Sequence, residues 1–246
     1  MRGFIDLHSH WVAAVDDGAR TTEEGRALLE ALYAAGFDRV IATPHMRPGM
    51  FENDRPALEA AFERTLQAIG VSVEKQVGKL PQVGLASEHF FDDVVYERLV
   101  NGQGLPYPGG KAALVEFAVG RFPARAQHRL HDLMQHKIRP VIAHPERYEP
   151  VWKDIHVLDP LLDVGAVLLL DVAALAGKYG RAPRKAAEAL LKEGFYYAAC
   201  SDAHKAKDVE DVSEGIRELY EQAGDEEATF LLSEGPRHIL EGKVES

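Results

Sequence analysis

The chain has 246 residues, which suits one large domain or a single barrel. Its 28 Lys and Arg against 39 Asp and Glu give a formal net charge of −11, which argues against general binding to nucleic acids or anionic membranes. The single cysteine, Cys200, allows no disulfide within the chain, and the sequence begins without a basic segment followed by an apolar one. We therefore expect a cytoplasmic protein, not inserted in a membrane, with Cys200 in its core. The oligomeric state is not indicated.

Short apolar segments alternate with segments of helical periodicity, which is the pattern of a parallel α/β fold. The predicted strands cover residues 4–8, 39–43, 82–87, 112–117, 140–143, 166–171 and 196–201. A first helix is predicted to begin at a capping box of Thr21 and Glu24 and to end at Gly36. Further helices are predicted at residues 56–69, 124–136, 155–164, 183–193 and 209–222. Residues 70–80 lack a period and predict a loop, and no domain boundary is visible.

Every predicted strand ends at or just before a side chain that can bind a metal ion. In chain order these side chains are His8 and His10, His45, Glu88, Glu116, His144, Asp171, and Asp202 with His204. The carboxyl ends of the strands of a β/α barrel meet at one mouth, so residues far apart in the sequence become neighbours there. Side chains two residues apart on a strand share a face, which lets His8 and His10 act together. The sequence therefore predicts a barrel with a metal site at its mouth.

The number and type of these ligands indicate a site with more than one ion. With Asp17 and without Asp171, the set holds five histidines and four carboxylates, too many for one ion, so we expect two or three. Imidazole and carboxylate ligands suit Mn, Fe or Zn, and Mg stays open. Clustered divalent ions attract an anionic substrate and lower the pKa of a bridging water to near neutrality. Hydrolysis of a phosphate ester by a metal-bridging hydroxide is the predicted chemistry.

Three basic residues stand close to proposed ligands in the sequence. Arg147 lies in "AHPERY", Arg47 lies in "TPHMRPGMF", and Lys205 directly follows His204. A guanidinium group can bind two phosphate oxygens at once, so we expect these residues to bind substrate, although each could instead form a surface ion pair.

Four other residues near the proposed site have structural interpretations. His89 is expected to face away from Glu88 and to pack near Phe91, and Trp11 to line the mouth or fill the core. Glu146 is expected to pair with a neighbouring arginine. A thiol mechanism is not predicted, because the arginine that should follow a cysteine nucleophile is missing after Cys200.

The segments "DLHSH", "VDDG", "TPH", "GMFE", "VEF", "AHPERY" and "SDAH", in this order, resemble the polymerase and histidinol phosphatase (PHP) superfamily. More closely, the chain is similar to the bacterial capsular-polysaccharide type of metal-dependent protein-tyrosine phosphatase, from Asp6 to about His204. The resemblance implies a distorted (β/α)7 TIM-like barrel with three metal ions, usually Mn. It also implies hydrolysis of phosphotyrosine on a cytoplasmic tyrosine kinase that controls exopolysaccharide export. We expect one domain over residues 1–246, with a helical segment at about 225–246 capping the barrel.

The resemblance also assigns roles to individual residues. The metal ligands that it implies are His8, His10, Asp17, His45, Glu88, Glu116, His144, Asp202 and His204. It makes Arg147 the phosphate-binding arginine, and we expect catalytic roles for Arg147, His45 and His204. The chain departs from the family pattern after His204, where an arginine is missing and Lys205 or Lys207 would have to replace it. It departs also at Asp171, where relatives commonly have Asn, and in a longer 70–80 loop.

Three other functions stay open on the sequence alone. A histidinol-phosphate type of small-molecule phosphatase would share the metal ligands and differ in the loops around the mouth. A PHP nuclease is disfavoured by the acidic charge. A non-catalytic metal-binding partner protein is disfavoured by the complete set of ligands.

Overall fold

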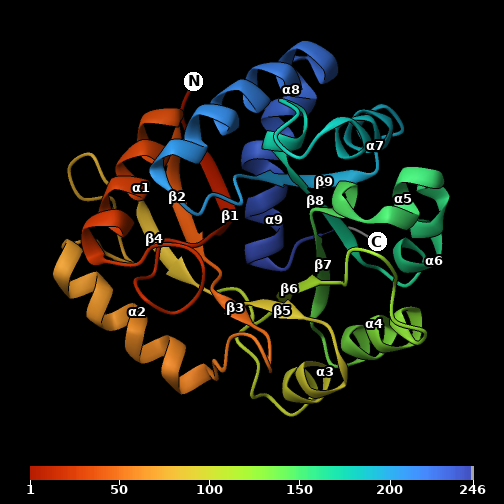
Figure 1. The fold of residues 1–246 in the computed structure, drawn as a ribbon, viewed down its shortest axis with the longest axis horizontal. Helices are drawn as coiled ribbons and strands as arrows, with labels where there is room; N and C mark the ends of the chain where they lie inside the picture. The colour runs from red at the N-terminus through yellow and green to blue at the C-terminus, as the bar shows by residue number, and fades with distance from the viewer. Residues whose placement is uncertain (245–246) are drawn as a thin grey trace.

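The computed structural model describes residues 1–244, in which helices surround a ring of parallel strands (Figure 1). The strands are β1 (Phe4–Ser9), β2 (Phe37–Ala42), β3 (His45–Met46), β4 (Gln82–Leu85), β5 (Glu88–Phe90), β6 (Ala112–Glu116), β7 (Arg139–Ala143), β8 (Val167–Asp171) and β9 (Tyr196–Cys200). The α-helices are α1 (Thr22–Ala35), α2 (Arg55–Ile69), α3 (Asp93–Val100), α4 (Ala126–Gln135), α5 (Glu149–Lys153), α6 (Asp159–Leu162), α7 (Arg181–Lys192), α8 (Val209–Thr229) and α9 (Gly235–Glu241).

The strands form two parallel sheets that together make the ring. One sheet has the order β1-β2-β4 and the other the order β3-β5-β6-β7-β8-β9. The two sheets meet where β2 is followed by β3 and β4 by β5, and the Ala86 N–H donates to the Ala42 carbonyl there at 2.8 Å. On the other side β9 lies beside β1, since the Asp202 N–H donates to the His8 carbonyl at 2.9 Å. This arrangement confirms the predicted distorted (β/α)7 barrel.

The elements differ from the predicted ones in several places. The predicted strand at 82–87 is two strands, β4 and β5, and the two-residue strand β3 pairs with β5 through His45 and Glu88. The helices α3 and α5 were not predicted. The predicted helix at 155–164 is a 3-10 turn (Ile155–Leu158) followed by α6. The 70–80 loop is confirmed, because it contains no helix or strand.

The first helix shows how the sequence sets the local structure. The Thr21 hydroxyl accepts a hydrogen bond from the Glu24 N–H at 3.3 Å, and Gly36 ends the helix in the left-handed conformation with φ 113°. The Glu24 carboxylate accepts from the Arg20 N–H instead of completing the predicted box at Thr21. Leu28 and Leu32 are fully buried, so α1 lies with its apolar stripe against the barrel.

Apolar side chains from successive strands fill the barrel below its mouth. Leu7, Ile41, Leu114 and Leu169 are fully buried in one cluster, to which Cys200 also belongs. This packing confirms Cys200 as a core residue and leaves the carboxyl ends of the strands to carry the polar side chains.

The C-terminal residues pack against the first and last strands. Ile239 and Leu240 of α9 join the apolar cluster inside the barrel, and the Ser233 hydroxyl donates to the Gly3 carbonyl at 3.2 Å. Figure 1 shows α9 within the outline of the surrounding helices, near β9. The predicted cap at 225–246 extends over residues 245–246, which lie outside the described residues. Within residues 1–244, no helix combines the length and apolar character that crossing a membrane requires.

Candidate metal centre

Histidines and carboxylates from many strand ends converge at the mouth of the barrel. They form four overlapping groups in which one ligand atom of each residue lies within 4.8 Å of the others. The groups are His10, Asp17, His45 and His204; His8, His144 and Asp202; His8, His10 and Glu88; and His45, Glu88 and Glu116. The structure thus brings together every residue that the sequence motifs suggest as a metal ligand.

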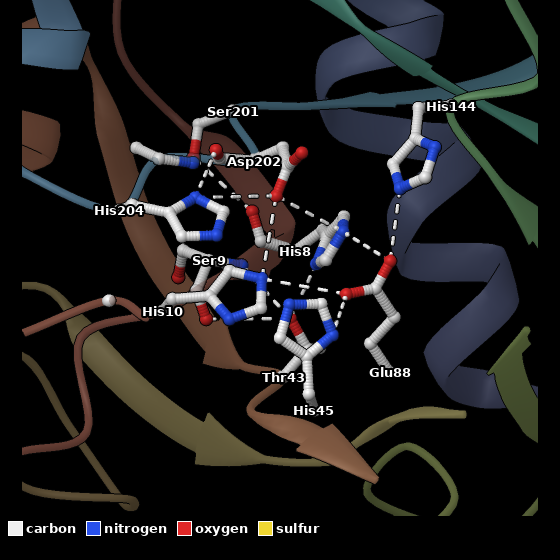
Figure 2. Close-up of polar contacts among 12 residues, drawn as sticks. His8, Ser9, His10, Thr43, His45, Glu88, His144, Ser201, Asp202 and His204 are labelled. Carbon is white, nitrogen blue, oxygen red and sulfur yellow. Dashed lines mark hydrogen bonds and ion pairs between the residues drawn. The ribbon is translucent and has the colours of Figure 1, made fainter. Parts of the chain in front are cut away.

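The Glu88 carboxylate lies between His144 on one side and the rings of His8 and His45 on the other (Figure 2). Its Oε1 atom is 2.9 Å from His144 Nε2 and 3.3 Å from His8 Nε2, and its Oε2 atom is 2.8 Å from His45 Nδ1. Burial alone would raise the pKa of Glu88, but the charges of His8 and His45 hold it well below its ordinary value. Glu88 is therefore an ionised, fully buried carboxylate that several histidines share.

Several side-chain atoms in the cluster are buried and form no well-aligned hydrogen bond within residues 1–244, although some of them, such as His45 Nδ1, lie in ion-pair contact with Glu88. These atoms are His8 Nε2, His10 Nε2, His45 Nδ1, Glu116 Oε2, His144 Nδ1 and Asp202 Oδ1. Buried polar atoms are rarely left unsatisfied, because each one costs free energy. Divalent cations would satisfy imidazole nitrogens and carboxylate oxygens together, so this donor set fits metal ions.

Two ligand rings are oriented by residues that the sequence analysis did not assign to the site. His10 Nδ1 donates to Asp16 Oδ2 at 2.8 Å, while His8 Nδ1 lies 2.5 Å from Thr43 Oγ1. Burial opposes the charge of Asp16, but the partner His10 lowers the pKa of Asp16 below its ordinary value. Partners of this kind fix which imidazole nitrogen faces a metal ion.

Asp17, His45 and His204 form the outer part of the cluster. Asp17 Oδ1 is 3.4 Å from His45 Nε2 and 3.5 Å from His204 Nε2, and these two contacts lower the pKa of Asp17. Burial disfavours charge on His45, but Glu88 and Asp17 raise its pKa to about 11. Against the same burial penalty, Asp17 and Asp202 raise the pKa of His204 to about 9. Ion pairs thus hold this outer part of the cluster together.

Two of the candidate ligands, Glu116 and His144, have pKa values shifted toward their neutral forms. Burial and the nearby Glu88 charge raise the pKa of Glu116 to about 8. Burial and the positive charge of Arg147 lower the pKa of His144 to about 4. A neutral imidazole is the form that binds a metal ion. His144 is already neutral at pH 7 and could bind a metal ion without first losing a proton.

Two of the strand-end turns hold unusual backbone conformations. His144 has φ 32° and Asp202 has φ 42°, both in the left-handed region, which non-glycine residues seldom adopt. Such strain is kept only where the surrounding structure enforces it, and it is frequent at functional sites. Here it turns two ligand side chains into the mouth.

Arg147 lies at the edge of the cluster, on the 3-10 turn after β7. Its Nη1 atom is 2.5 Å from Asp202 Oδ2 and 4.0 Å from Asp171 Oδ2, and its guanidinium stacks over the Tyr179 ring at 4.7 Å. About a quarter of its side chain is exposed (26%), so it can reach a ligand in the mouth. Asp171 faces Arg147 and belongs to none of the four ligand groups.

The predicted pairing of Glu146 with an arginine is wrong. Glu146 is fully buried, where its carboxylate accepts from the Asp171 N–H at 3.0 Å and from the Tyr196 hydroxyl at 2.9 Å. Burial and the charge of Asp171 raise the pKa of Glu146 to about 8. The residue joins β8 and β9 behind Arg147 because the turn after β7 points it into the protein.

The other basic residues differ in how they lie relative to the cluster. The Arg47 guanidinium stacks over the Phe90 ring at 4.0 Å, close to the end of β5. Lys205 and Lys207 are exposed. Lys178, which the sequence analysis did not consider, lies near the same Tyr179 ring as Arg147, with its Nζ atom 5.5 Å from the ring centre.

Two residues with reactive side chains lie away from the ligand groups. His89 is fully buried, with Nδ1 2.8 Å from the Leu114 carbonyl and Nε2 accepting from the Leu105 N–H at 3.0 Å. The Cys200 thiol donates to the Leu170 carbonyl, and burial raises its pKa well above the ordinary value. A buried thiol of raised pKa is a poor nucleophile, which agrees with the absence of a predicted thiol mechanism.

A parallel α/β barrel with clustered histidines and carboxylates at the carboxyl ends of its strands defines the class of metal-binding barrel hydrolases. The capsular polysaccharide synthesis family CpsB/CapC matches residues 4–241, and the chain belongs to this family. The resemblance carried by the sequence motifs is thereby confirmed.

Named relatives extend over almost the whole chain. The tyrosine-protein phosphatase YwqE of Bacillus subtilis is 27% identical over 98% of this chain and 92% of its own length. The tyrosine-protein phosphatase CpsB of Streptococcus pneumoniae is 25% identical over 96% of this chain and 98% of its own.

Solved structures show the same fold. A chain from the crystal structures of YwqE and CpsB, described as unique metal-dependent tyrosine phosphatases, has a TM-score of 0.87 at 26% identity and covers 98% of this chain and 95% of its own length. The phosphotriesterase homology protein of Escherichia coli has a TM-score of 0.58 at 15% identity, covering 97% of this chain and 98% of its own. The second likeness concerns the fold alone.

Proposed function

We propose that this protein is a metal-dependent phosphatase that hydrolyses phosphotyrosine on proteins. The observation that carries the proposal is the convergence of histidines and carboxylates, several of whose buried side-chain atoms form no well-aligned hydrogen bond within the described residues, with Arg147 at their edge. The printed names of the relatives support phosphotyrosine as the substrate.

In this proposal the cluster holds two or three divalent metal ions, with Mn first and Fe, Zn or Mg as substitutes. The ligands are the residues of the four groups, His8, His10, Asp17, His45, Glu88, Glu116, His144, Asp202 and His204. Bound divalent ions would lower the pKa of a water molecule and stabilise negative charge on phosphate oxygens. Asp16 and Thr43 hold the rings of His10 and His8 in place for them.

The basic residues bind and orient the phosphate group. Arg147 has further N–H groups besides the one that donates to Asp202, and these are available to phosphate oxygens. Arg47 supplies a second positive charge from the side of β5, and Lys205 a third from the loop after β9. We assign catalytic roles to Arg147, His45 and His204, since His45 and His204 belong to the outer part of the cluster and Arg147 lies at its edge.

The partner proposed for the phosphatase is a cytoplasmic bacterial tyrosine kinase of capsule or exopolysaccharide synthesis. The family's description supports the capsule, and the net charge of −11 disfavours nucleic acid. We further propose that residues 1–246 act as one domain whose C-terminal segment caps the barrel, in the cytoplasm.

The test is phosphate release by protein that has been stripped with a chelator and reloaded with Mn. A phosphotyrosine peptide and histidinol phosphate are compared, and the proposal predicts Mn-dependent release mainly from the peptide. Release mainly from histidinol phosphate would support the proposed metal site but indicate a small-molecule substrate instead of a protein. Release from neither, with Mn bound, would favour the non-catalytic or nuclease alternatives.

A further inference from the structure

A groove lies beside the metal cluster, between the loops that follow β5 and β6. It encloses about 410 Å³, and its walls include Phe90, Val94, Ala118 and Pro123. The helices α3 and α4, which begin at these loops, lie next to each other in Figure 1 and are joined by the Tyr96 hydroxyl, which donates to Asp132 at 2.5 Å. The groove is therefore part of the face that carries the carboxyl ends of the strands.

The groove is adjacent to the cluster, because two of its lining residues lie on or beside a strand pair that also carries a candidate ligand. Phe90 of β5 is the register partner of Glu116 of β6, and the Phe91 N–H donates to the Glu116 carbonyl at 2.8 Å. Glu116 belongs to a ligand group, and the Arg47 guanidinium covers the Phe90 ring at 4.0 Å. A molecule that extends from the cluster past Arg47 would therefore meet Phe90, the groove residue that is paired with the candidate ligand Glu116.

The apolar walls of the groove are only partly covered by the protein itself. The Val94 side chain stands in the first turn of α3 and the residue is 50% exposed. Phe90 is half-buried. A half-exposed apolar wall next to a polar site can gain free energy by covering an apolar side chain of a ligand.

The charged residues of the groove leave one cation available. Arg129 forms an ion pair with Asp93 at 2.5 Å, and Asp92 accepts the Val95 N–H at 2.8 Å as the cap of α3. Arg121 is exposed, and within residues 1–244 its side chain forms no hydrogen bond or ion pair. The groove thus offers an apolar wall and a free guanidinium.

We propose that this groove binds the residues directly beside the phosphotyrosine of a protein substrate, with an apolar side chain against Phe90 and Val94 and a carboxylate at Arg121. This inference rests on the proposed function, because it needs a phosphotyrosine anchored at the cluster. Free phosphotyrosine places nothing in the groove, so it serves as the internal reference.

The experiment measures binding and turnover on Mn-loaded protein. Binding is measured by fluorescence anisotropy with labelled peptides in which a non-hydrolysable phosphonate analogue replaces phosphotyrosine. One pair of peptides has leucine or alanine at the position directly before the analogue, and a second pair has leucine or alanine at the position directly after it. Since the leucine side chain would be about half buried in the groove, we expect the leucine peptide to bind about three- to tenfold more tightly than the alanine peptide. This preference is expected at one of the two flanking positions. A further pair of peptides has glutamate or glutamine at the second residue from the phosphotyrosine analogue. Tighter binding of the glutamate peptide would indicate a contact with Arg121.

Matched variants locate the effect. Val94→Ser should abolish the leucine preference, and Arg121→Gln the glutamate preference, while kcat/KM for free phosphotyrosine stays within about twofold of wild type. Val73→Ser is the control, because Val73 is 49% exposed in the 70–80 loop, away from the groove. It should leave both preferences unchanged.

Other results overturn the inference. Two results would show that the groove does not bind the flanking residues. One is equal binding of the leucine and alanine peptides to wild-type protein, and the other is an unchanged leucine preference in Val94→Ser. An equal loss on free phosphotyrosine would show that the variants damage the cluster instead. If wild-type protein with Mn bound releases phosphate from none of these substrates, the proposed function fails, and the groove assignment falls with it.

Discussion

Asp16→Asn would test whether the cluster depends on a carboxylate that is not itself a proposed ligand. Asp16 Oδ2 accepts from His10 Nδ1 at 2.8 Å and from the His45 N–H at 3.2 Å, and its Oδ1 accepts from the Gly18 N–H at 3.0 Å. Asparagine has the same shape but only one acceptor oxygen. Either the His10 ring or the turn at Gly18 must therefore lose its acceptor.

The expected loss is about 10- to 100-fold in Mn affinity, which corresponds to about 1.4–2.7 kcal/mol, as found when partners that orient metal-binding histidines are removed. Calorimetric titration of the stripped protein with Mn measures this loss, and a thermal melt checks that the variant folds. Asp211→Asn, on an exposed position of α8, removes one negative charge without touching the cluster and is the control. Wild-type Mn affinity in a folded Asp16→Asn protein would refute the role of Asp16 in orienting His10.

Four further outcomes are expected. His144→Ala should reduce phosphate release at least about 100-fold with an unchanged melting temperature of the stripped protein, whereas the exposed His128→Ala should leave the rate unchanged. Removing metal with a chelator should lower the melting temperature by about 8–16 °C relative to protein at 1,000-fold excess over the dissociation constant, and Mn should restore it; equal melting curves would contradict a resident metal. Gly18→Ala should weaken Mn binding, measured by titration, because a Cβ at this position would overlap the backbone oxygen and Cβ of His10. Cys200→Ala should keep phosphate release within about twofold, and a large loss would revive a thiol mechanism.

The sequence predicted which side chains converge, because their positions follow from strand geometry. A polar residue at the end of an apolar run has to lie at the mouth of a parallel barrel, so His45, Glu88 and Glu116 could be placed without knowing how the loops fold. The buried role of Asp16 does not follow from strand geometry, because Asp16 lies in a turn after β1. The turn folds back so that the Ala19 N–H donates to the His10 carbonyl at 3.0 Å, and this long-range closure decides which carboxylate faces inward.

The predictions that failed depended on contacts between distant segments. Glu146 has an arginine beside it in the sequence, but its partners on β8 and β9 come from residues 25 and 50 positions away. The strand β3 has two residues, too few to show a period, and it exists because His45 pairs with Glu88. A signal for α3 was present, since Asp92 caps the Val95 N–H and Val95 and Leu99 are buried one turn apart.

The contact between the first and last strands has a consequence for how the protein matures. Asp6 on β1 accepts hydrogen bonds from the backbone and hydroxyl of Ser201, 195 residues later, and the cluster itself needs both His8 and Asp202. Most of the chain therefore has to leave the ribosome before β1 and the segment after β9 can come into contact. Contacts of such high sequence separation form slowly, so the nascent protein presents only partial metal sites for most of its synthesis. If the cluster holds the proposed metal ions, their loading would be a late event, and the metal pool that the finished chain meets would decide which ion it receives.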